Sequence, residues 1–213
     1  MTPNATPSVT VEGQGSASAT PDLMRVTVSV EARRPDVAGA FARAGEAAAA
    51  VAAALRGAGV ADADLSTTGL GVQAETVWQE NHGQQVVGYL ATSTLAVTLR
   101  DLSDPGRVIA DCVAAGGDDV RLGGLELGFA DQDDLLGRAR EAAYLDARTK
   151  AEQYARLSGR GLGAVLEVTE TADARPSPRP MLRAMAATAD ASMPVERGES
   201  AVSAGVRVCW ALI

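Results

Sequence analysis

The stretch EAAYLDARTKAEQYARLSGRGLG, residues 141–163, predicts a helix, a stop and then a strand. Alanines recur at every fourth residue, a spacing that drifts only slowly round a helix of about 3.6 residues per turn. Opposite charges four residues apart favour a solvated second face. Gly159, Gly161 and Gly163 then end the helix before the strand AVLEVTET. The alanines are Ala139, Ala143, Ala147, Ala151 and Ala155, and the charge pairs are Asp146 with Lys150, Arg148 with Glu152, and Glu152 with Arg156.

Acidic residues mark the start of this helix. Asp131 is expected to cap it, and Asp133 and Asp134 stand in the first turn, where the helix dipole favours negative charge. A metal site at these three carboxylates is the less favoured alternative, because adjacent carboxylates at a helix start usually serve as caps. Residues 120–130, VRLGGLELGFA, are expected to form the preceding strand.

The N-terminal part alternates between apolar and polar residues, as half-buried strands do. Residues 9–19 and 23–32 are predicted as two strands, with a turn at Pro21-Asp22 that would make them a hairpin. Gly13 and Gly15 fall inside the first strand, where glycine indicates a bulge or a close approach of another backbone.

A second helix is expected after a capping Asp36 and before Gly57 and Gly59. One side carries an apolar stripe of Val37, Ala40, Phe41, Ala44, Ala48, Val51 and Leu55. The opposite side has few charges, and a helix that is apolar on all sides is usually covered on both. That opposite side consists of Ala38, Ala42, Gly45, Ala49, Ala52 and Ala53.

The remaining elements complete an α+β pattern. Two long strands, about 64–78 and 85–100, are expected to meet at the turn Asn81-His82-Gly83, and a short helix to begin at Asp104-Pro105 and end at Gly116-Gly117. Residues 173–198 are rich in Pro, Ala and Met without any period, which indicates a long mobile loop. A strand over 201–213 closes the chain.

The order of these elements predicts the domain organisation. Strand, helix, strand, strand over 23–100 is followed by the same order over 120–213, which suggests two similar halves with an antiparallel or mixed sheet and packed helices. We expect a flexible tail over 1–7 and a single domain over 8–213. Its halves would span about 8–103 and 104–213.

Composition excludes several classes of function. The 213 residues carry a formal net charge of −8 and no basic run with interleaved aromatics, so nucleic-acid binding is not expected. The N-terminus has no charged and apolar pattern of a signal peptide, and no apolar run approaches the roughly 20 residues of a membrane span. Taken as it stands, the sequence predicts a cytoplasmic protein. Cys112 lies on an apolar helix face far from Cys209, so a disulfide is the less favoured alternative.

No residue set stands out as a catalytic or cofactor site. His82, the only histidine, falls in a polar turn without a Cys or His neighbour, which favours a solvated residue over a ligand. The glycines at 159–163 follow a helix, whereas a phosphate loop precedes one. Asp118-Asp119 is interpreted as a plain turn. We therefore expect no catalytic residue, no cofactor and no bound metal, and elemental analysis of the purified protein would test the last point.

The Pro-rich loop offers the remaining candidates. Three methionines there could form an adaptable contact surface, or they could have no role beyond lying in a disordered loop. The arginines with intervening prolines could form a docking segment. These residues are Met181, Met185, Met193, Arg175, Arg179 and Arg183.

Several of these segments together resemble the SIMPL-domain family, which includes exported bacterial proteins linked to oxidative-stress defence and kinase-interacting proteins. The similar segments cover about residues 8–213 in the expected order. They are VTVEGQGSASATPDLMRVTVSVEA, VVGYLATSTLAVTLRDL, AREAAYLDARTKAEQYARLSGRGLG, the Pro-rich loop and PVERGESAVSAGVRVCWAL. The resemblance implies an α+β fold, self-association and a stress-related or interaction role, with no catalytic residues to carry over. Since family members usually begin with an export signal, it also implies a cell-envelope or periplasmic location as the alternative, with a trimmed start.

Three functions follow from these observations. The first is a non-enzymatic, self-assembling protein that acts in stress protection or as an interaction scaffold. The second is an enzyme on a small polar substrate, with carboxylates such as Asp22 or Glu199 in a cleft. The third is a peptide-binding module that uses strand edges or the loop at 173–198. The expected partner is a second copy of the chain, with a further protein partner as an option.

Overall fold

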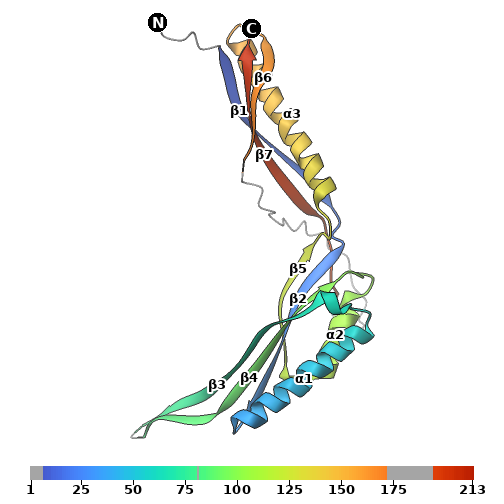
Figure 1. The fold of residues 1–213 in the computed structure, drawn as a ribbon, viewed down its shortest axis with the longest axis vertical. Helices are drawn as coiled ribbons and strands as arrows, with labels where there is room; N and C mark the ends of the chain where they lie inside the picture. Colours follow the sequence, from blue (N-terminus) through green and yellow to red (C-terminus); the bar gives the residue numbers. More distant parts are fainter. Residues whose placement is uncertain (1–6, 81, 172–193) are drawn as a thin grey trace. The chain divides into compact units, whose positions relative to one another are not determined.

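The computed structural model describes residues 7–80, 82–171 and 194–213, and these form an α+β protein of two compact units (Figure 1). Each unit consists of one antiparallel sheet and its helices. The strands are β1 (Ser8–Ala19), β2 (Leu23–Arg34), β3 (Leu65–Gln79), β4 (Gly83–Leu99), β5 (Val120–Gly128), β6 (Leu162–Thr171) and β7 (Ser200–Leu212). The helices are α1 (Val37–Gly57), α2 (Pro105–Gly116) and α3 (Asp133–Leu157), with one-turn 3₁₀ helices η1 (Asp62–Asp64) and η2 (Gly117–Asp119).

The first unit contains β1, α3, β6 and β7. Its three-stranded sheet has the order β1-β7-β6, and α3 lies across β1 and β7 (Figure 1). The alanine row expected on α3 is confirmed as its buried face, at Ala139, Ala143, Ala147, Ala151 and Ala155.

Glycines in β1 explain how closely this helix packs on its sheet. A β-carbon on Gly13 would overlap the backbone of Ala143 and Ala147, and one on Gly15 would overlap the backbone of Ala139. The expected close backbone approach at these two glycines is therefore confirmed. Alanine on the helix and glycine on the strand bring the two backbones together, which side chains of ordinary size would prevent.

The second unit contains β2, α1, β3, β4, α2 and β5. Its four-stranded sheet has the order β3-β4-β2-β5, with α1 packed over β2 and β4 and α2 packed beside α1. Alternate residues of β2, from Met24 to Ala32, are buried together with the inward side of α1. Val195, which belongs to this unit, also packs against that core.

The expected hairpin of the first two strands is wrong. β1 pairs with the C-terminal strand β7, whereas β2 pairs with β4 and β5. Pro21-Asp22 is therefore a connection between two sheets. Asp22 begins the second unit, where its N–H donates to the carbonyl of Gly128 at 3.1 Å and its Oδ1 accepts from the N–H of Ala130 at 2.7 Å.

The repeated order of elements exists, but its second copy begins with a different strand. In the second unit, β2-α1-β3-β4 forms a sheet of order β3-β4-β2, and in the first unit β1-α3-β6-β7 forms a sheet of order β6-β7-β1. The expected opening strand, residues 120–130, instead adds β5 to the far side of β2. The units consequently interleave along the chain, and the contacts do not divide it near residue 103.

Most of the loop that the sequence predicts over residues 173–198 lies outside the described residues. Residues 173–193, with Met181, Met185, Met193 and the three arginines Arg175, Arg179 and Arg183, are among those not described, as are residues 1–6. Residues 194–199 have no regular secondary structure.

Helix α1 has one buried side and one exposed side. The buried residues are Ala40, Ala44, Ala47, Val51 and Leu55. Val37 and Phe41, expected in the packed stripe, are instead largely exposed, with Phe41 50% accessible. Among the described helices, α1 alone is long and apolar enough to pass as a membrane span by length and composition, although its inward side is buried against the sheet.

Candidate functional site

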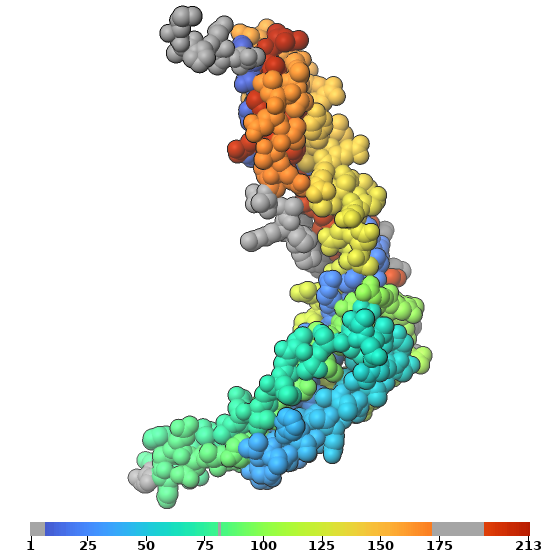
Figure 2. Space-filling view, viewed as in Figure 1, coloured from blue at the N-terminus to red at the C-terminus, as the bar shows by residue number. Residues whose placement is uncertain are grey.

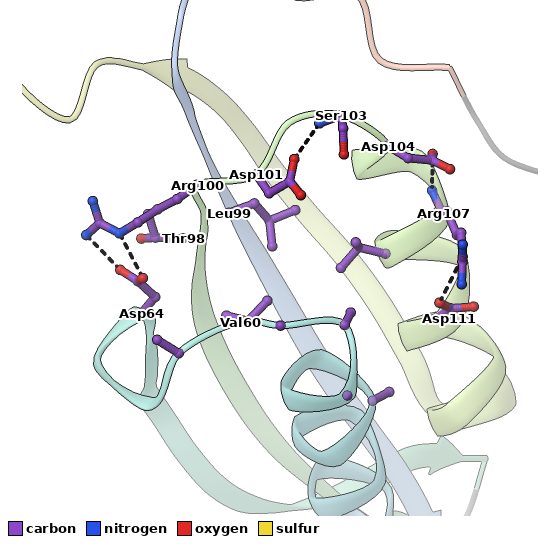
Figure 3. Close-up of a pocket in the computed structure, with 16 residues that line it drawn as sticks. Val60, Asp64, Thr98, Leu99, Arg100, Asp101, Ser103, Asp104, Arg107 and Asp111 are labelled. Carbon is purple, nitrogen blue, oxygen red and sulfur yellow. Dashed lines mark hydrogen bonds and ion pairs between the residues drawn. The ribbon is translucent and has the colours of Figure 1, made fainter.

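A cleft in the second unit lies where α1 ends, β4 ends and α2 begins (Figure 3). It has a volume of about 670 Å³ and is open to solvent. Three local features shape it: the turn after α1, the residues after Leu99, and the N-terminus of α2, where Pro105 occupies the first turn. Charged residues line its wall.

Arg100 and Asp64 form the closest ion pair in the cleft. The guanidinium donates through Nε to Asp64 Oδ2 at 2.8 Å and through a terminal nitrogen to Oδ1 at 2.9 Å, a bidentate geometry (Figure 3). The hydrogen bond from Arg100 lowers the pKa of Asp64 below its usual value. Asp64 is therefore ionised at neutral pH, and both of its oxygens are engaged by Arg100.

Asp101 and Asp104 hold the loop and the helix of the cleft, while Asp111 pairs with Arg107 one turn earlier on α2 at 3.9 Å. Asp101 Oδ1 accepts from the N–H of Ser103 at 2.9 Å, and hydrogen bonds from Ser103 lower the pKa of Asp101. Asp104 Oδ1 accepts from the N–H of Arg107 at 3.1 Å, which confirms the expected cap at Asp104-Pro105. These carboxylates stabilise local backbone structure, as N-terminal caps do.

The cleft holds a polar surface without a catalytic arrangement among its lining residues. Its hydroxyl groups come from Thr98 and Ser103, and neither histidine nor cysteine lines it. Nucleophilic catalysis needs a base within hydrogen-bonding reach of the nucleophile, and the nearby carboxylates are held by arginine or backbone partners. Within the described ranges, no group of three His, Cys, Asp or Glu side chains gathers as metal ligands would.

A smaller, mainly apolar cavity of about 240 Å³ lies in the first unit between α3 and the strands β6 and β7. Tyr144 and Val168 line it, and Arg140 pairs with Glu170 at its rim at 3.0 and 3.3 Å. Tyr144 also stands 6.1 Å, centroid to centroid, from the buried Trp210. The cavity is too small for a drug-sized ligand, for which pockets begin at about 300 Å³.

The residues singled out from the sequence are not brought together. His82 lies in an exposed turn, with Nδ1 3.4 Å from the carbonyl of Glu80. Asp131 accepts from the N–H of Asp133 at 2.8 Å, so it serves the helix start, although the cap position itself is Gln132. Asp22 and Glu199, the carboxylates of the enzyme hypothesis, line neither of these two cavities.

The glycines after α3 end the helix as expected. Gly159 has φ +70°, in the left-handed region that favours glycine, and its N–H donates to the carbonyl of Arg156 at 3.0 Å. Gly161 exchanges backbone hydrogen bonds with Ile213 and so begins the pairing of β6 with β7. The interpretation of helix, stop and strand is confirmed.

One tertiary contact was missed by the sequence analysis, which placed Asp146 and Lys150 on the solvated face of α3. Asp146 Oδ2 accepts from the backbone N–H of Gln14 at 2.9 Å, and Lys150 Nζ donates to the carbonyl of Glu12 at 3.0 Å and to Asp146 at 2.6 Å. This pair therefore satisfies backbone groups on the outer edge of β1. The glycines at 13 and 15 were the available signal, since they place the helix against this strand.

Comparison with known proteins identifies the family. The model of the SIMPL family, described as "Protein of unknown function (DUF541)", matches residues 9–210. The chain belongs to the SIMPL family. This SIMPL protein is 30% identical to the "26 kDa periplasmic immunogenic protein" of Brucella melitensis, over 95% of this chain and 83% of that protein. It is 31% identical to the "Uncharacterized protein YggE" of Escherichia coli K12, over 86% of this chain and 73% of that protein.

Proposed function

We propose that this SIMPL protein is a non-enzymatic scaffold that assembles from several copies of itself. The observation that carries the proposal is the outer side of α1. Ala38, Ala42, Gly45, Ala49 and Ala53 are all exposed there, and the large side chains of Val37 and Phe41 are exposed beside them. A continuous apolar surface of this kind usually marks an interaction site.

The small side chains of this helix suit contact with a second copy. Alanine and glycine allow another helix or strand to approach closely, and they lose little side-chain freedom when they are covered. Charge also favours the site, because α1 carries Arg43, Glu46 and Arg56 in a chain whose net charge is −8. Two copies can meet there without the repulsion that the acidic surface creates elsewhere.

The cleft supports the non-enzymatic part of the proposal. Asp64 is engaged with Arg100, Asp101 and Asp104 with backbone N–H groups, and no nucleophile and base face one another among the lining residues. An enzyme would need such a pair or a cofactor. Screening the purified protein with hydrolase and redox substrates tests this part, and turnover that is lost on Asp64→Asn substitution would contradict it.

We also propose that the protein resides in the cell envelope or periplasm. The support is the name of the Brucella melitensis relative, which describes a periplasmic protein, and the comparisons give the cytoplasmic expectation no support. Fractionation of cells that express the gene from its natural start would locate the protein. Recovery in the cytoplasm alone would refute the placement.

A stress-protective role is the finer part of the proposal and rests on the family resemblance. The test is a deletion of the gene, with growth measured under peroxide. Unchanged survival of the deletion strain, with normal survival of the complemented strain, would remove this role and leave the scaffold proposal intact.

Light scattering on a sizing column tests assembly itself. We expect a mass of several chains at tens of micromolar protein, where one chain has a mass of 21.7 kDa. A single-chain mass at that concentration would refute the proposal.

A further inference from the structure

Each sheet of this protein has two edge strands, and three of these four edges carry features that oppose pairing with another chain. Exposed backbone groups along an edge are a template for a further strand, and proteins usually block them with charges, bulges or a covering element. The edges are β1 and β6 in the first unit and β3 and β5 in the second.

The β1 edge is occupied by the helix of its own unit. The N–H of Gln14 and the carbonyl of Glu12 are engaged by Asp146 and Lys150. Because these two groups already have partners, a second strand would have to displace both side chains before it could pair along this part of the edge.

The β5 and β6 edges carry charges and irregular register. β5 contains Arg121 and Glu126, and its pairing with β2 shifts at Gly124. β6 contains Glu167 and Glu170, and its pairing with β7 shifts twice between Leu162 and Glu167. Charges and bulges are the ordinary means by which edge strands resist further pairing.

The β3 edge also has register shifts, but it lacks the several charges of β5 and β6 and the helix contacts of β1. Its 15 residues include no Lys, Arg or Pro, and the single charged residue, Glu75, is held by Arg33 at 2.8 Å. The pairing of β3 with β4 shifts in register before Gly69 and after Glu75, and the residues between these two shifts pair without interruption. Leu70 within this run is 67% exposed.

The end of the β3–β4 ribbon exposes further large apolar side chains. β2 pairs with β4 only as far as Tyr89, so residues 76–79 and 83–88 form a ribbon of two strands alone. Figure 2 shows this end, in green, extending past α1 without cover from another described element on the face in view. It exposes Val77, Val86, Val87 and Trp78, and Trp78 is 80% accessible. A two-stranded ribbon by itself is only marginally stable in water.

We propose that β3 is the edge along which a second copy of this chain pairs, with the two β3 strands antiparallel. This inference rests on the proposed function and names the surface that assembly uses in addition to α1. A two-fold axis at Val72 sets Glu75 of each copy opposite Gly69 of the other, so no like charges face one another. Pairing of β3 with β3 uses the same edge in both copies, and the other edge of this sheet, β5, is protected. The sheets of two copies therefore join into one, and no third copy can add to it to form a fibre.

The β3 strand itself offers apolar side chains to a second copy. Leu70, Val72 and Trp78 lie on the same face of β3, since residues an even number apart point to one side, and a paired strand would cover part of each. These side chains and the paired backbone supply part of the roughly 800 Å² per partner of a standard interface, and the exposed side of α1 is the other surface that assembly uses.

Tryptophan fluorescence tests this surface in the unmodified protein. Of the two tryptophans, Trp210 is 2% exposed, so the emission that acrylamide quenches comes from Trp78. We expect this quenching to weaken as rising concentration drives assembly, and a Trp78→Phe variant to lack the concentration-dependent change. A Trp78 that stays fully quenchable while the scattered mass is that of several chains would overturn the proposal.

A charge on the edge gives the second measurement. Leu70→Lys should lower the assembled mass, and Leu157→Lys, a change at a 75% exposed leucine of α3, should not. Circular dichroism would establish that both variants are folded. An unchanged mass for folded Leu70→Lys would overturn the β3 proposal alone, whereas a wild-type chain that is monomeric at all concentrations would overturn the proposed function as well.

Discussion

Gly13 of β1 lies so close to Ala143 of α3 that a β-carbon on the glycine would overlap the carbonyl oxygen of the alanine. The backbones of the strand and the helix are therefore in direct contact. Glycine is needed at this position because it has no side chain, and not because the backbone adopts a conformation that only glycine allows. The overlapping atoms belong to backbone, so no side-chain rotation can relieve the clash.

Substitution at this contact should destabilise the protein. Gly13→Ala forces α3 away from β1, and we expect the free energy of unfolding to fall by at least the roughly 1–3 kcal/mol typical of an overpacked core. Urea unfolding followed by circular dichroism measures the change.

The control for that change is Gly45→Ala. A β-carbon there meets no atom within 4 Å, and Gly45 lies inside α1. Alanine in a helix interior is favoured over glycine by about 1 kcal/mol, so this variant should be slightly stabilised. Equal losses in both variants would contradict the packing argument.

The ion pair on the β1 edge should make stability depend on pH. Hydrogen bonds from Lys150 and from the N–H of Gln14 lower the pKa of Asp146 below its usual 3.8. A lowered folded-state pKa means that the stabilisation is present above the unfolded-state pKa and is lost as the pH falls through the folded-state value.

The measurement compares wild type with Asp146→Asn. Wild-type protein should lose free energy of unfolding as the pH drops below about 4, and the variant should lose less over the same range. Unfolding curves at several pH values give both slopes. Parallel slopes would show that Asp146 contributes nothing to the acid response.

A charge on the outer side of α1 should disrupt assembly. Ala49→Arg places a guanidinium where the proposal puts a covered apolar surface, and a buried charge without a partner is strongly unfavourable. We expect a lower mass by light scattering with an unchanged circular dichroism spectrum. Ala114→Arg, at an exposed alanine of α2, should keep the wild-type mass.

Cys112 should be inert in the folded protein. Burial raises the pKa of its thiol to about 11, and the thiolate is the reactive form. Both cysteines are free. Native protein treated with iodoacetamide at pH 8 should carry no label on Cys112 by peptide mass analysis, whereas urea-unfolded protein should carry it. Labelling at equal rates in the two states would refute the assignment.

Local structure could be predicted well because its causes are local. The alanine row of α3 and the cap at Asp104 depend on residues a few positions apart, and both are confirmed. Strand pairing could not be predicted in the same way. The residues between Ala19 and Leu23 give no sign that β1 pairs with a strand almost 200 residues later. A proline turn between two strands instead favours a hairpin.

The charged residues show the same division. Asp146 and Lys150 were correctly expected to pair along the helix, but their bonds to the backbone of β1 need the tertiary fold. Arg100 and Asp64, which shape the cleft, are 36 residues apart and belong to no known pattern. The sequence predicted no catalytic, cofactor or metal residue, and that expectation stays a prediction.

Because β1 pairs with β7, the two units can fold only one after the other during translation. β1 leaves the exit tunnel first, yet β7, its hydrogen-bonding partner, is made only at residues 200–212. At about 5–20 residues per second, β1 waits roughly 10–40 s, while residues 22–130, most of the second unit, are already available to fold. The nascent chain thus carries an unpaired N-terminal strand through most of its synthesis, and a ribosome that stalls before residue 200 releases a product whose first sheet has lost its central strand.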